Sequence, residues 1–235
     1  MGIMPPQGAV DKLCRYASLL LEQNQVMNLT AITQPDQVAR LHFLDSAAVL
    51  AYGSPGGQPS GGAGASWLAG KSLVDVGTGA GFPGLVVAVL RPELSVTLLD
   101  PLEKRLNFIR EVIVMLGLHN VALLHVRGED AGRDPALRER FDVTTARAVA
   151  ELTVLAELCL PLTKVGGWFL PMKSVDSDGE AERAKPLLGQ LGGSLAGHWD
   201  YQIPGTDVSH RVWRIEKSRP TPEQFPRKWS RIKKK

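Results

Sequence analysis

The feature that most constrains this chain is a run from Leu73 to Gly84 that reads LVDVGTGAGFPG. Its apolar first residues predict a buried strand, its alternating glycines predict a tight turn, and Pro83 suits the first turn of a following helix. Glycines remove the Cβ atoms that would hold a ligand away from the backbone, and a helix start presents unpaired N–H groups and a positive dipole end. The run therefore predicts a strand-turn-helix that binds polar, partly anionic groups of a nucleotide-like cofactor.

Two classes of protein share such a loop. The spacing Gly79-x-Gly81-x-x-Gly84 matches the dinucleotide fingerprint, whereas the longer pattern that begins at Asp75 resembles the first motif of S-adenosylmethionine-dependent methyltransferases. The glycines alone leave both interpretations open.

The remaining elements predict an α/β fold. Strands are expected at 72–76, 95–100, 121–126, 141–146 and 166–172, with helices at about 83–90, 103–116, 148–160 and 177–190. Strands rich in Val and Leu that alternate with helices indicate a parallel sheet covered on both faces. Two further strand-like runs, 193–199 and 210–217, have no helix between them and predict an antiparallel hairpin at the sheet end. This seven-stranded, mostly parallel sheet resembles the Rossmann-like methyltransferase fold, whereas a dehydrogenase would continue with parallel units.

The N-terminal segment has a different pattern. Apolar residues three and four apart predict an amphipathic helix from Val10 to Leu21, and a second helix is expected from Pro35 to Ala51. Residues 53–66 contain only Gly, Ser, Pro, Ala and Gln, which indicates a flexible loop. We therefore predict a helical cap over 1–52, this loop, a methyltransferase domain over 67–220 and a basic tail over 221–235.

Composition excludes several classes. The chain is 44% hydrophobic and 22% charged, as in globular proteins, and no apolar run approaches the ~18 residues of a membrane span. Cys14 and Cys159 lack Cys-x-x-Cys spacing, and the five histidines lack metal-ligand spacing. We expect a cytoplasmic protein without a metal, a disulfide framework or a membrane partner.

The basic charge lies at the C-terminus. Residues 227–235 hold six Lys and Arg side chains and no acid, so the net charge of +3 would become −3 without them. Such a run is either a solvated tail or an arm that binds phosphates, and Trp229 within it favours RNA, since its ring could stack on an unpaired base.

Five candidate site residues lie at or just after the ends of predicted strands. Asp100 could accept both ribose hydroxyls of a nucleoside, or it could interact with the start of the next helix. Gly128 and Glu129 could border an adenine or form a surface turn. Arg147 could bind a carboxylate or phosphate in the crevice, or pair with Glu151 on the surface. Lys173 could face the same crevice or the solvent.

Five ordered motifs then resemble one family. They are Asn28-Leu29-Thr30-Ala31-Ile32, Leu41-His42-Phe43-Leu44-Asp45-Ser46, the Asp75–Gly84 loop, Glu103-Lys104-Arg105-Leu106-Asn107-Phe108 and Thr145-Ala146-Arg147-Ala148. Together they are similar to motifs of the bacterial glucose-inhibited division protein B family, small-subunit ribosomal RNA guanine-N7 methyltransferases. The resemblance covers about residues 10–230, with departures at Pro101 and Ser174.

This resemblance implies the site. It places Gly77, Phe82, Asp100, Gly128, Glu129 and Arg147 at S-adenosylmethionine, to which we add Gly79 of the loop and Leu102 after Asp100. Arg147 and Lys173 are the expected catalytic positions, and the expected partner is small-subunit rRNA or the assembled small ribosomal subunit, with the enzyme a monomer.

The implied chemistry agrees with the residues that the chain lacks. Guanine N7 carries no proton, so its direct in-line attack on a sulfonium methyl needs alignment and no general base or covalent enzyme intermediate. The alternatives are a nicotinamide-dependent oxidoreductase, a non-catalytic RNA-binding protein, and a methyltransferase acting on a small molecule or protein.

Overall fold

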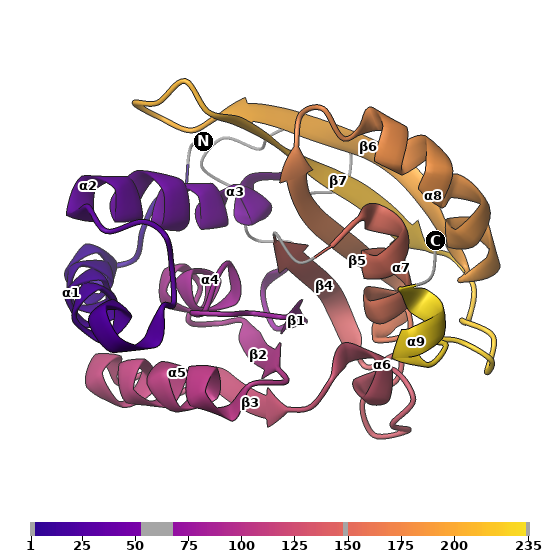
Figure 1. The fold of residues 1–235 in the computed structure, drawn as a ribbon, viewed down its shortest axis with the longest axis horizontal. Coiled ribbons are helices and arrows are strands. Elements are labelled where there is room, and N and C mark those ends of the chain that lie inside the picture. Colours follow the sequence, from indigo (N-terminus) through magenta and orange to yellow (C-terminus); the bar gives the residue numbers. More distant parts are fainter. Residues whose placement is uncertain (1–2, 53–67, 148–149, 234–235) are drawn as a thin grey trace.

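The computed structural model describes residues 3–52, 68–147 and 150–233 of the chain. Its centre is a seven-stranded sheet with the order β3-β2-β1-β4-β5-β7-β6 (Figure 1). The strands are β1 (Ser72–Val76), β2 (Ser95–Asp100), β3 (Val121–His125), β4 (Phe141–Arg147), β5 (Thr163–Ser174), β6 (Gly193–Gln202) and β7 (Ser209–Lys217). The flexible loop predicted at 53–66 lies outside the described residues.

The strand directions confirm the predicted fold class. Strands β1 to β5 run parallel to one another, and β7 is antiparallel to both β5 and β6. The last two strands thus form the expected antiparallel hairpin at the sheet end. An oxidoreductase of the dinucleotide-binding type, our alternative, was expected to continue with parallel units instead.

Helices cover both faces of the sheet (Figure 1). One face packs against α3 (Asp45–Tyr52), α4 (Gly84–Leu90) and α5 (Glu103–Leu116), and the other against α7 (Leu152–Cys159) and α8 (Asp178–Gln190). Helix α1 (Ala9–Met27) packs on α4 and α5. Successive side chains of a strand point to opposite faces, so Leu73 of β1 joins the first core and Val74 joins the second.

The N-terminal helices differ from the prediction in two ways. Helix α1 continues to Met27, past the polar Asn24, because the Asn24 side chain exchanges two hydrogen bonds with the backbone of Thr30, at 2.8 and 2.9 Å. The single helix expected from Pro35 to Ala51 is a short α2 (Pro35–Gln37), a π-helical segment η1 (Val38–Leu44) and then α3. A π-helical stretch rearranges which side chains share a face, and apolar spacing does not reveal it.

The segment after β7 packs onto the second face. Thr221, Phe225 and Ile232 are buried there, and the short α9 (Trp229–Ile232) lies beside α7 in Figure 1. Arg227 forms a bidentate ion pair with the fully buried Glu157, with its closest N–O distance at 2.6 Å. One of the six positive charges that we predicted for a free or RNA-binding tail therefore has a structural role.

Candidate active site

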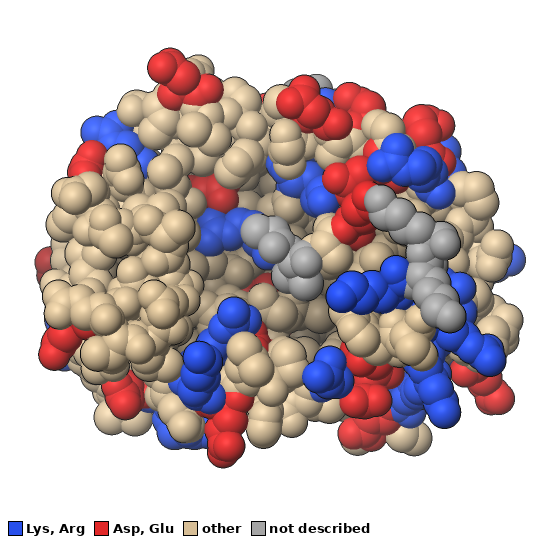
Figure 2. Space-filling view, in the orientation of Figure 1, with Lys and Arg blue, Asp and Glu red and all other residues tan. Residues whose placement is uncertain are grey.

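The carboxyl ends of the parallel strands bring the predicted site residues to one edge of the sheet. The pairing of Val76 with Leu99 places Gly77 beside Asp100, and Arg147 ends the neighbouring β4. Figure 2 shows this region as a hollow with Lys and Arg side chains around it. Ligands of open α/β sheets bind in such a crevice.

The glycine loop follows β1 and turns through left-handed backbone conformations. Gly77, Gly79 and Gly81 have φ angles of 74°, 62° and 105°. The N–H groups of Gly77 and Thr78 both donate to the carbonyl of Leu99, which ties the loop to β2. A Cβ atom at Gly79 would meet no protein atom within 4 Å, whereas one at Gly81 would lie 2.6 Å from the Tyr16 hydroxyl. The loop backbone therefore borders open space at Gly79 and is packed against protein at Gly81.

Asp75 anchors the loop from inside β1. Its Oδ2 atom accepts hydrogen bonds from Thr78 Oγ1 at 2.7 Å and from the Gly84 N–H at 2.9 Å. Its Oδ1 atom has no hydrogen-bond partner among the described residues. Burial raises the pKa of Asp75 to about 6, although the bond from Thr78 acts in the opposite direction. Only glycine fits at position 84 in this contact, because a Cβ atom there would lie 2.3 Å from the Leu98 side chain.

Asp100 lies directly beneath the loop and is fully buried. Its Oδ2 accepts the N–H of Gly79 at 3.0 Å, and its Oδ1 accepts the N–H of Leu102 at 2.9 Å, at the start of α5. Arg105, which is 40% exposed, covers the carboxylate from outside at 3.4 Å. The helix-start interaction that we considered for Asp100 is therefore present, and its carboxylate is enclosed by protein groups.

Three other residues that we predicted to bind the cofactor lie in the segments that follow β2 and β3, at the same edge of the sheet. Leu102 is 42% exposed, which is unusual for a large apolar side chain next to a crevice. Glu129, in the short α6 (Gly128–Ala131) after β3, is 6% exposed and its carboxylate has no hydrogen-bond partner in the described part of the chain. A Cβ at Gly128 would contact Val76 at 3.3 Å, so close packing of α6 against β1 explains this glycine.

Arg147 points toward the N-terminal helices. Its Nη1 lies 2.6 Å from Asp45 Oδ2, its Nη2 lies 3.3 Å from His42 Nδ1, and its guanidinium carbon lies 5.1 Å from the centre of the Phe82 ring. His42 stacks on the Phe82 ring at 4.4 Å. The ion-pair partner of Arg147 is thus Asp45, where our surface alternative had named Glu151. Phe82 packs among protein groups and is 7% exposed.

Asp45 connects the cap to three strands. Besides Arg147 of β4, it accepts hydrogen bonds from the Tyr201 hydroxyl of β6 and from His210 Nδ1 of β7, both at 2.7 Å. Burial alone would raise the pKa of Asp45, but the bond from His210 and the charge of Arg147 hold it below its ordinary value. The carboxylate is therefore ionised at neutral pH.

His42 is neutral at neutral pH for the converse reason. Burial lowers the pKa of His42 to about 4, and the positive charge of Arg147 acts in the same direction. Its Nε2 lies 2.7 Å from Thr30 Oγ1. The imidazole can therefore accept a hydrogen bond from Arg147 through Nδ1.

Lys173, at the end of β5, forms an ion pair of 2.8 Å with Glu180 of α8. A cavity of about 180 Å³ lies here and is lined by Arg147, Met172, Lys173, Ser174, Glu180 and His210. The structure thus brings the two predicted catalytic side chains, Arg147 and Lys173, to one cavity.

Sequence reasoning missed the residues that complete this site. His42, Asp45 and Glu180 were not proposed as site residues, and neither were Tyr201 and His210. They come from the cap, from α8 and from the last hairpin, which only the tertiary fold brings to the strand ends. The available signal was Asp45, a charged residue among apolar neighbours in an amphipathic helix.

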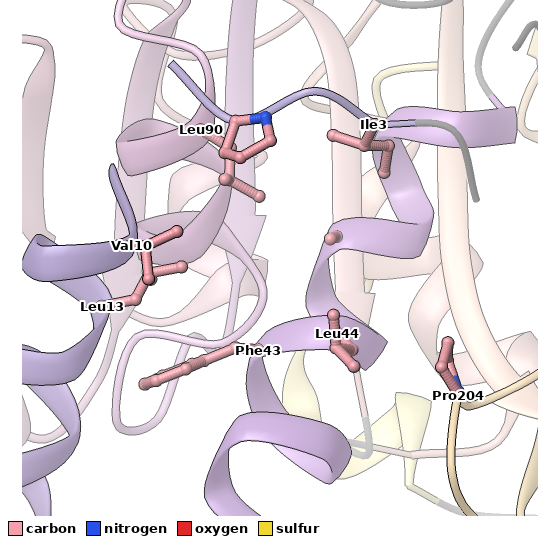
Figure 3. Close-up of a pocket in the computed structure, with 9 residues that line it drawn as sticks. Ile3, Val10, Leu13, Phe43, Leu44, Leu90 and Pro204 are labelled. Atoms are coloured by element: carbon pink, nitrogen blue, oxygen red, sulfur yellow. The ribbon is translucent and has the colours of Figure 1, made fainter. Parts of the chain in front are cut away.

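A larger apolar cavity, of about 310 Å³, lies between the N-terminal segment, α1, η1 and α4 (Figure 3). Its lining includes Ile3, Val10, Leu13, Phe43, Leu44 and Leu90, and it offers no charged side chain to orient a polar substrate. Within residues 3–52, 68–147 and 150–233, no helix is long and apolar enough to cross a membrane, and no three His, Cys, Asp or Glu side chains are grouped as metal ligands.

Comparisons with known sequences identify the relatives of the chain. The model of the GidB family, described as rRNA small subunit methyltransferase G, matches residues 9–191. The ribosomal RNA small subunit methyltransferase G of Clostridium perfringens (strain 13 / Type A) is 42% identical over 225 residues, covering 96% of this chain and 89% of the relative. The protein of the same name from Lactococcus lactis is 42% identical over 219 residues, covering 93% and 87%.

Solved structures share the fold. TYW2 of M. jannaschii in complex with AdoMet has a TM-score of 0.54 at 16% identity, covering 74% of this chain and 76% of that one. A mutant 16S rRNA (adenine(1408)-N(1))-methyltransferase from Catenulisporales acidiphilia, with cosubstrate SAM, has a TM-score of 0.51 at 19% identity, covering 66% and 89%. At these identities the likeness concerns the fold alone.

Proposed function

The chain belongs to the GidB family of small-subunit rRNA methyltransferases, and on that basis we propose that it transfers a methyl group from S-adenosylmethionine to N7 of a guanine in small-subunit rRNA. The observation that carries this proposal is the 42% identity to a ribosomal RNA small subunit methyltransferase G over 96% of the chain. The N7 atom as acceptor rests on the resemblance of the five sequence motifs.

The crevice has features that fit S-adenosylmethionine. The backbone of Gly79 borders open space, Glu129 is buried without a hydrogen-bond partner among the described residues, and Leu102 exposes an apolar side chain. The residues that would hold the cofactor are Gly77, Gly79, Phe82, Asp100, Leu102, Gly128, Glu129 and Arg147. When bound, S-adenosylmethionine supplies an electrophilic methyl group on a sulfonium.

Asp100 can act on the ribose only if its carboxylate becomes accessible. Three protein groups surround it in this structure, and Arg105 is the most exposed of them. We propose that the Arg105 side chain moves away when the ribose hydroxyls bind. Such a rearrangement costs little free energy, because the Arg105–Asp100 contact, at 3.4 Å, is long for an ion pair.

The residues at the site suit methylation without proton abstraction. Guanine N7 already has a lone pair, so the protein must align the base and exclude competing nucleophiles. Cys159 is fully buried in the core, and burial raises the pKa of its thiol, while Cys14 lies on the outer surface of α1. Neither cysteine is placed to form a covalent intermediate at the crevice, which supports direct transfer.

The partner and the location follow from the same proposal. We propose that the enzyme acts as a monomer in the cytoplasm, where small-subunit rRNA is found, and that its substrate is rRNA or the assembled small subunit. Light scattering of the purified protein tests the monomer.

The function is tested by incubating the protein with labelled S-adenosylmethionine and one of three acceptors. These are unmodified small subunits, their deproteinised rRNA, and a mixture of ribosomal proteins without RNA. The proposal predicts label in RNA from the first or second mixture. Label that appears without RNA would assign the enzyme to a protein or small-molecule substrate.

A further inference from the structure

The cavity at the ends of β4 and β5 holds a fixed pair of opposite charges. Lys173 Nζ lies 2.8 Å from Glu180 Oε2 and donates to the Ala150 carbonyl at 3.0 Å. Glu180 Oε2 also accepts the N–H of Leu152 at 2.9 Å, at the start of α7. The side chains of Lys173 and Glu180 are only 14% and 24% exposed. Three elements therefore hold this pair in place.

Counting contacts with the described residues, the pair retains one free acceptor and one free donor. Glu180 Oε1 has no hydrogen-bond partner among the described residues, because both contacts of the carboxylate use Oε2. An ammonium group has three N–H donors, and Lys173 directs two of them to Ala150 and Glu180. The cavity thus presents a carboxylate oxygen next to an ammonium N–H.

Arg147 lines the same cavity but is already engaged. Its two terminal nitrogens bond to Asp45 and His42. Of the two basic side chains that we predicted near the target, Lys173 is the one that stands beside a carboxylate with an unused oxygen, so it can act together with Glu180 on one edge of a base.

Guanine has a matching edge. Its Watson–Crick edge carries the O6 acceptor and, further along, the N1–H and N2 amino donors, whereas N7 lies on a different edge of the ring. We propose that Lys173 Nζ donates to O6 and Glu180 Oε1 accepts from the N2 amino group, so that N7 stays free to react. This assignment rests on the proposed guanine-N7 methylation and names the residues that select the base.

The same arrangement disfavours adenine. In a purine held in the same position, adenine would place its N6 amino donor against the Lys173 ammonium and a C2–H against Glu180 Oε1. Both contacts would then be unsatisfied, and unpaired polar groups in a binding site give strong discrimination. Glu180 and Lys173 are thus specificity-determining residues in this proposal.

The test uses inosine, which lacks the N2 amino group. The methylated nucleotide is first mapped with labelled S-adenosylmethionine, and small subunits are then reconstituted with rRNA that carries either guanosine or inosine at that position. Wild-type protein, Glu180→Gln and Glu182→Gln are compared. Glu182 lies on the same helix, and its side chain is 68% exposed and pairs with Lys185, which makes Glu182→Gln a matched control.

Gln at position 180 can still accept the N–H of Leu152 with its amide oxygen. Its NH2 group then occupies the place of Oε1 and faces the N2 donor. We expect wild type to methylate the inosine substrate with a kcat/KM about ten- to a hundredfold below that of guanosine, the range for one hydrogen bond to a charged group. Glu180→Gln should lower kcat/KM for guanosine by a similar factor and bring the guanosine-to-inosine ratio close to one. Glu182→Gln should leave both values unchanged.

Two outcomes would overturn this assignment. Equal rates of wild type on guanosine and inosine would show that N2 is not recognised, and an unchanged ratio in a folded Glu180→Gln variant would show that Glu180 does not recognise it. Absence of label on any guanine with wild-type protein would instead contradict the proposed function itself. Cofactor affinity and urea unfolding of each variant confirm that it is folded.

Discussion

The guanidinium of Arg147 and the carboxylate of Asp45 form a 2.6 Å ion pair whose side chains are only 13% and 2% exposed. The pair joins β4 to the N-terminal cap, and its partners are 102 positions apart in the sequence. Because Asp45 also binds Tyr201 and His210, one carboxylate fixes the cap against the strand ends where the cofactor and the base are proposed to meet.

The Arg147→Lys variant tests what the geometry of this guanidinium contributes to turnover and cofactor affinity. A lysine keeps the charge and can reach Asp45, but it loses the planar fork that also contacts His42. We expect turnover or cofactor affinity to fall about tenfold or more, as for the loss of a charge-assisted bond of roughly 1.5–3 kcal/mol.

The buried pair also changes the expected stability. A surface pair with Glu151 would have contributed ~0.3–0.5 kcal/mol, whereas removal of one partner of a buried pair costs about 3–5 kcal/mol. Arg147→Met should therefore destabilise the protein strongly in urea unfolding, and Asp45→Asn combined with it should cost much less than the sum of the two. Additive effects would contradict a coupled pair.

Two glycines of the loop should respond differently to alanine. At Gly79 the new Cβ would enter open space, so the protein should fold with a cost of about 1–2 kcal/mol for its left-handed backbone, while affinity for S-adenosylhomocysteine falls sharply. At Gly84 the Cβ would lie 2.3 Å from Leu98, so the fold itself should be destabilised. Calorimetry and thermal unfolding of both variants separate these effects, and unchanged affinity in a folded Gly79→Ala protein would contradict cofactor binding at the loop.

His42 should make stability depend on pH. Its pKa is about 4 in the folded protein against 6.5 ordinarily, so between these values the unfolded chain binds a proton that the folded protein does not. The stability contributed by His42 is therefore lost as pH falls through this window, by about 1–2 kcal/mol from pH 7 to 5 after allowance for its partial exposure.

The unfolding free energy of wild type alone does not isolate the effect of His42, because Asp75 changes that free energy with pH in the opposite direction. Its pKa of about 6 lies above the ordinary 3.8, so its burial becomes less costly as pH falls. The difference in unfolding free energy between wild type and His42→Gln cancels this contribution. That difference should shrink by about 1–2 kcal/mol from pH 7 to 5, and a constant difference would refute a neutral His42.

The basic C-terminal segment is tested best without deleting it. Arg227 compensates the buried Glu157 and Ile232 is buried, so truncation would disturb the fold. Lys228, Arg231 and Lys233 are exposed and can be replaced together by Gln. If all three contact phosphates of single-stranded RNA, the slope of log affinity against log salt should flatten by about 2. Cofactor affinity should not change, and an identical slope would identify these charges as merely solvated.

Local patterns predicted the sheet well, because Val- and Leu-rich strands and the glycine loop are short-range signals. The β6–β7 hairpin followed from the missing helix between two apolar runs. The π-helical η1 was not predictable in this way, since its apolar spacing is also compatible with an α-helix.

The sequence predicted only those site residues that lie at the ends of strands. Asp100, Arg147 and Lys173 follow recognisable strands, so their common edge could be inferred from sequence. The partner of Arg147 could not, because Asp45 and His210 are 102 and 63 positions away from it and meet it only in the folded chain. Likewise, the free oxygen of Glu180 depends on the contact of α8 with the start of α7.

The most direct test of the whole account locates the transferred methyl group. Unmodified small ribosomal subunits are incubated with the protein and labelled S-adenosylmethionine, and the rRNA is then digested to nucleosides and separately cleaved at N7-methylated guanines. The account predicts that the label co-elutes with 7-methylguanosine and that the RNA is cleaved at a single guanine. Label on another base, on another guanine atom or outside the RNA would contradict it.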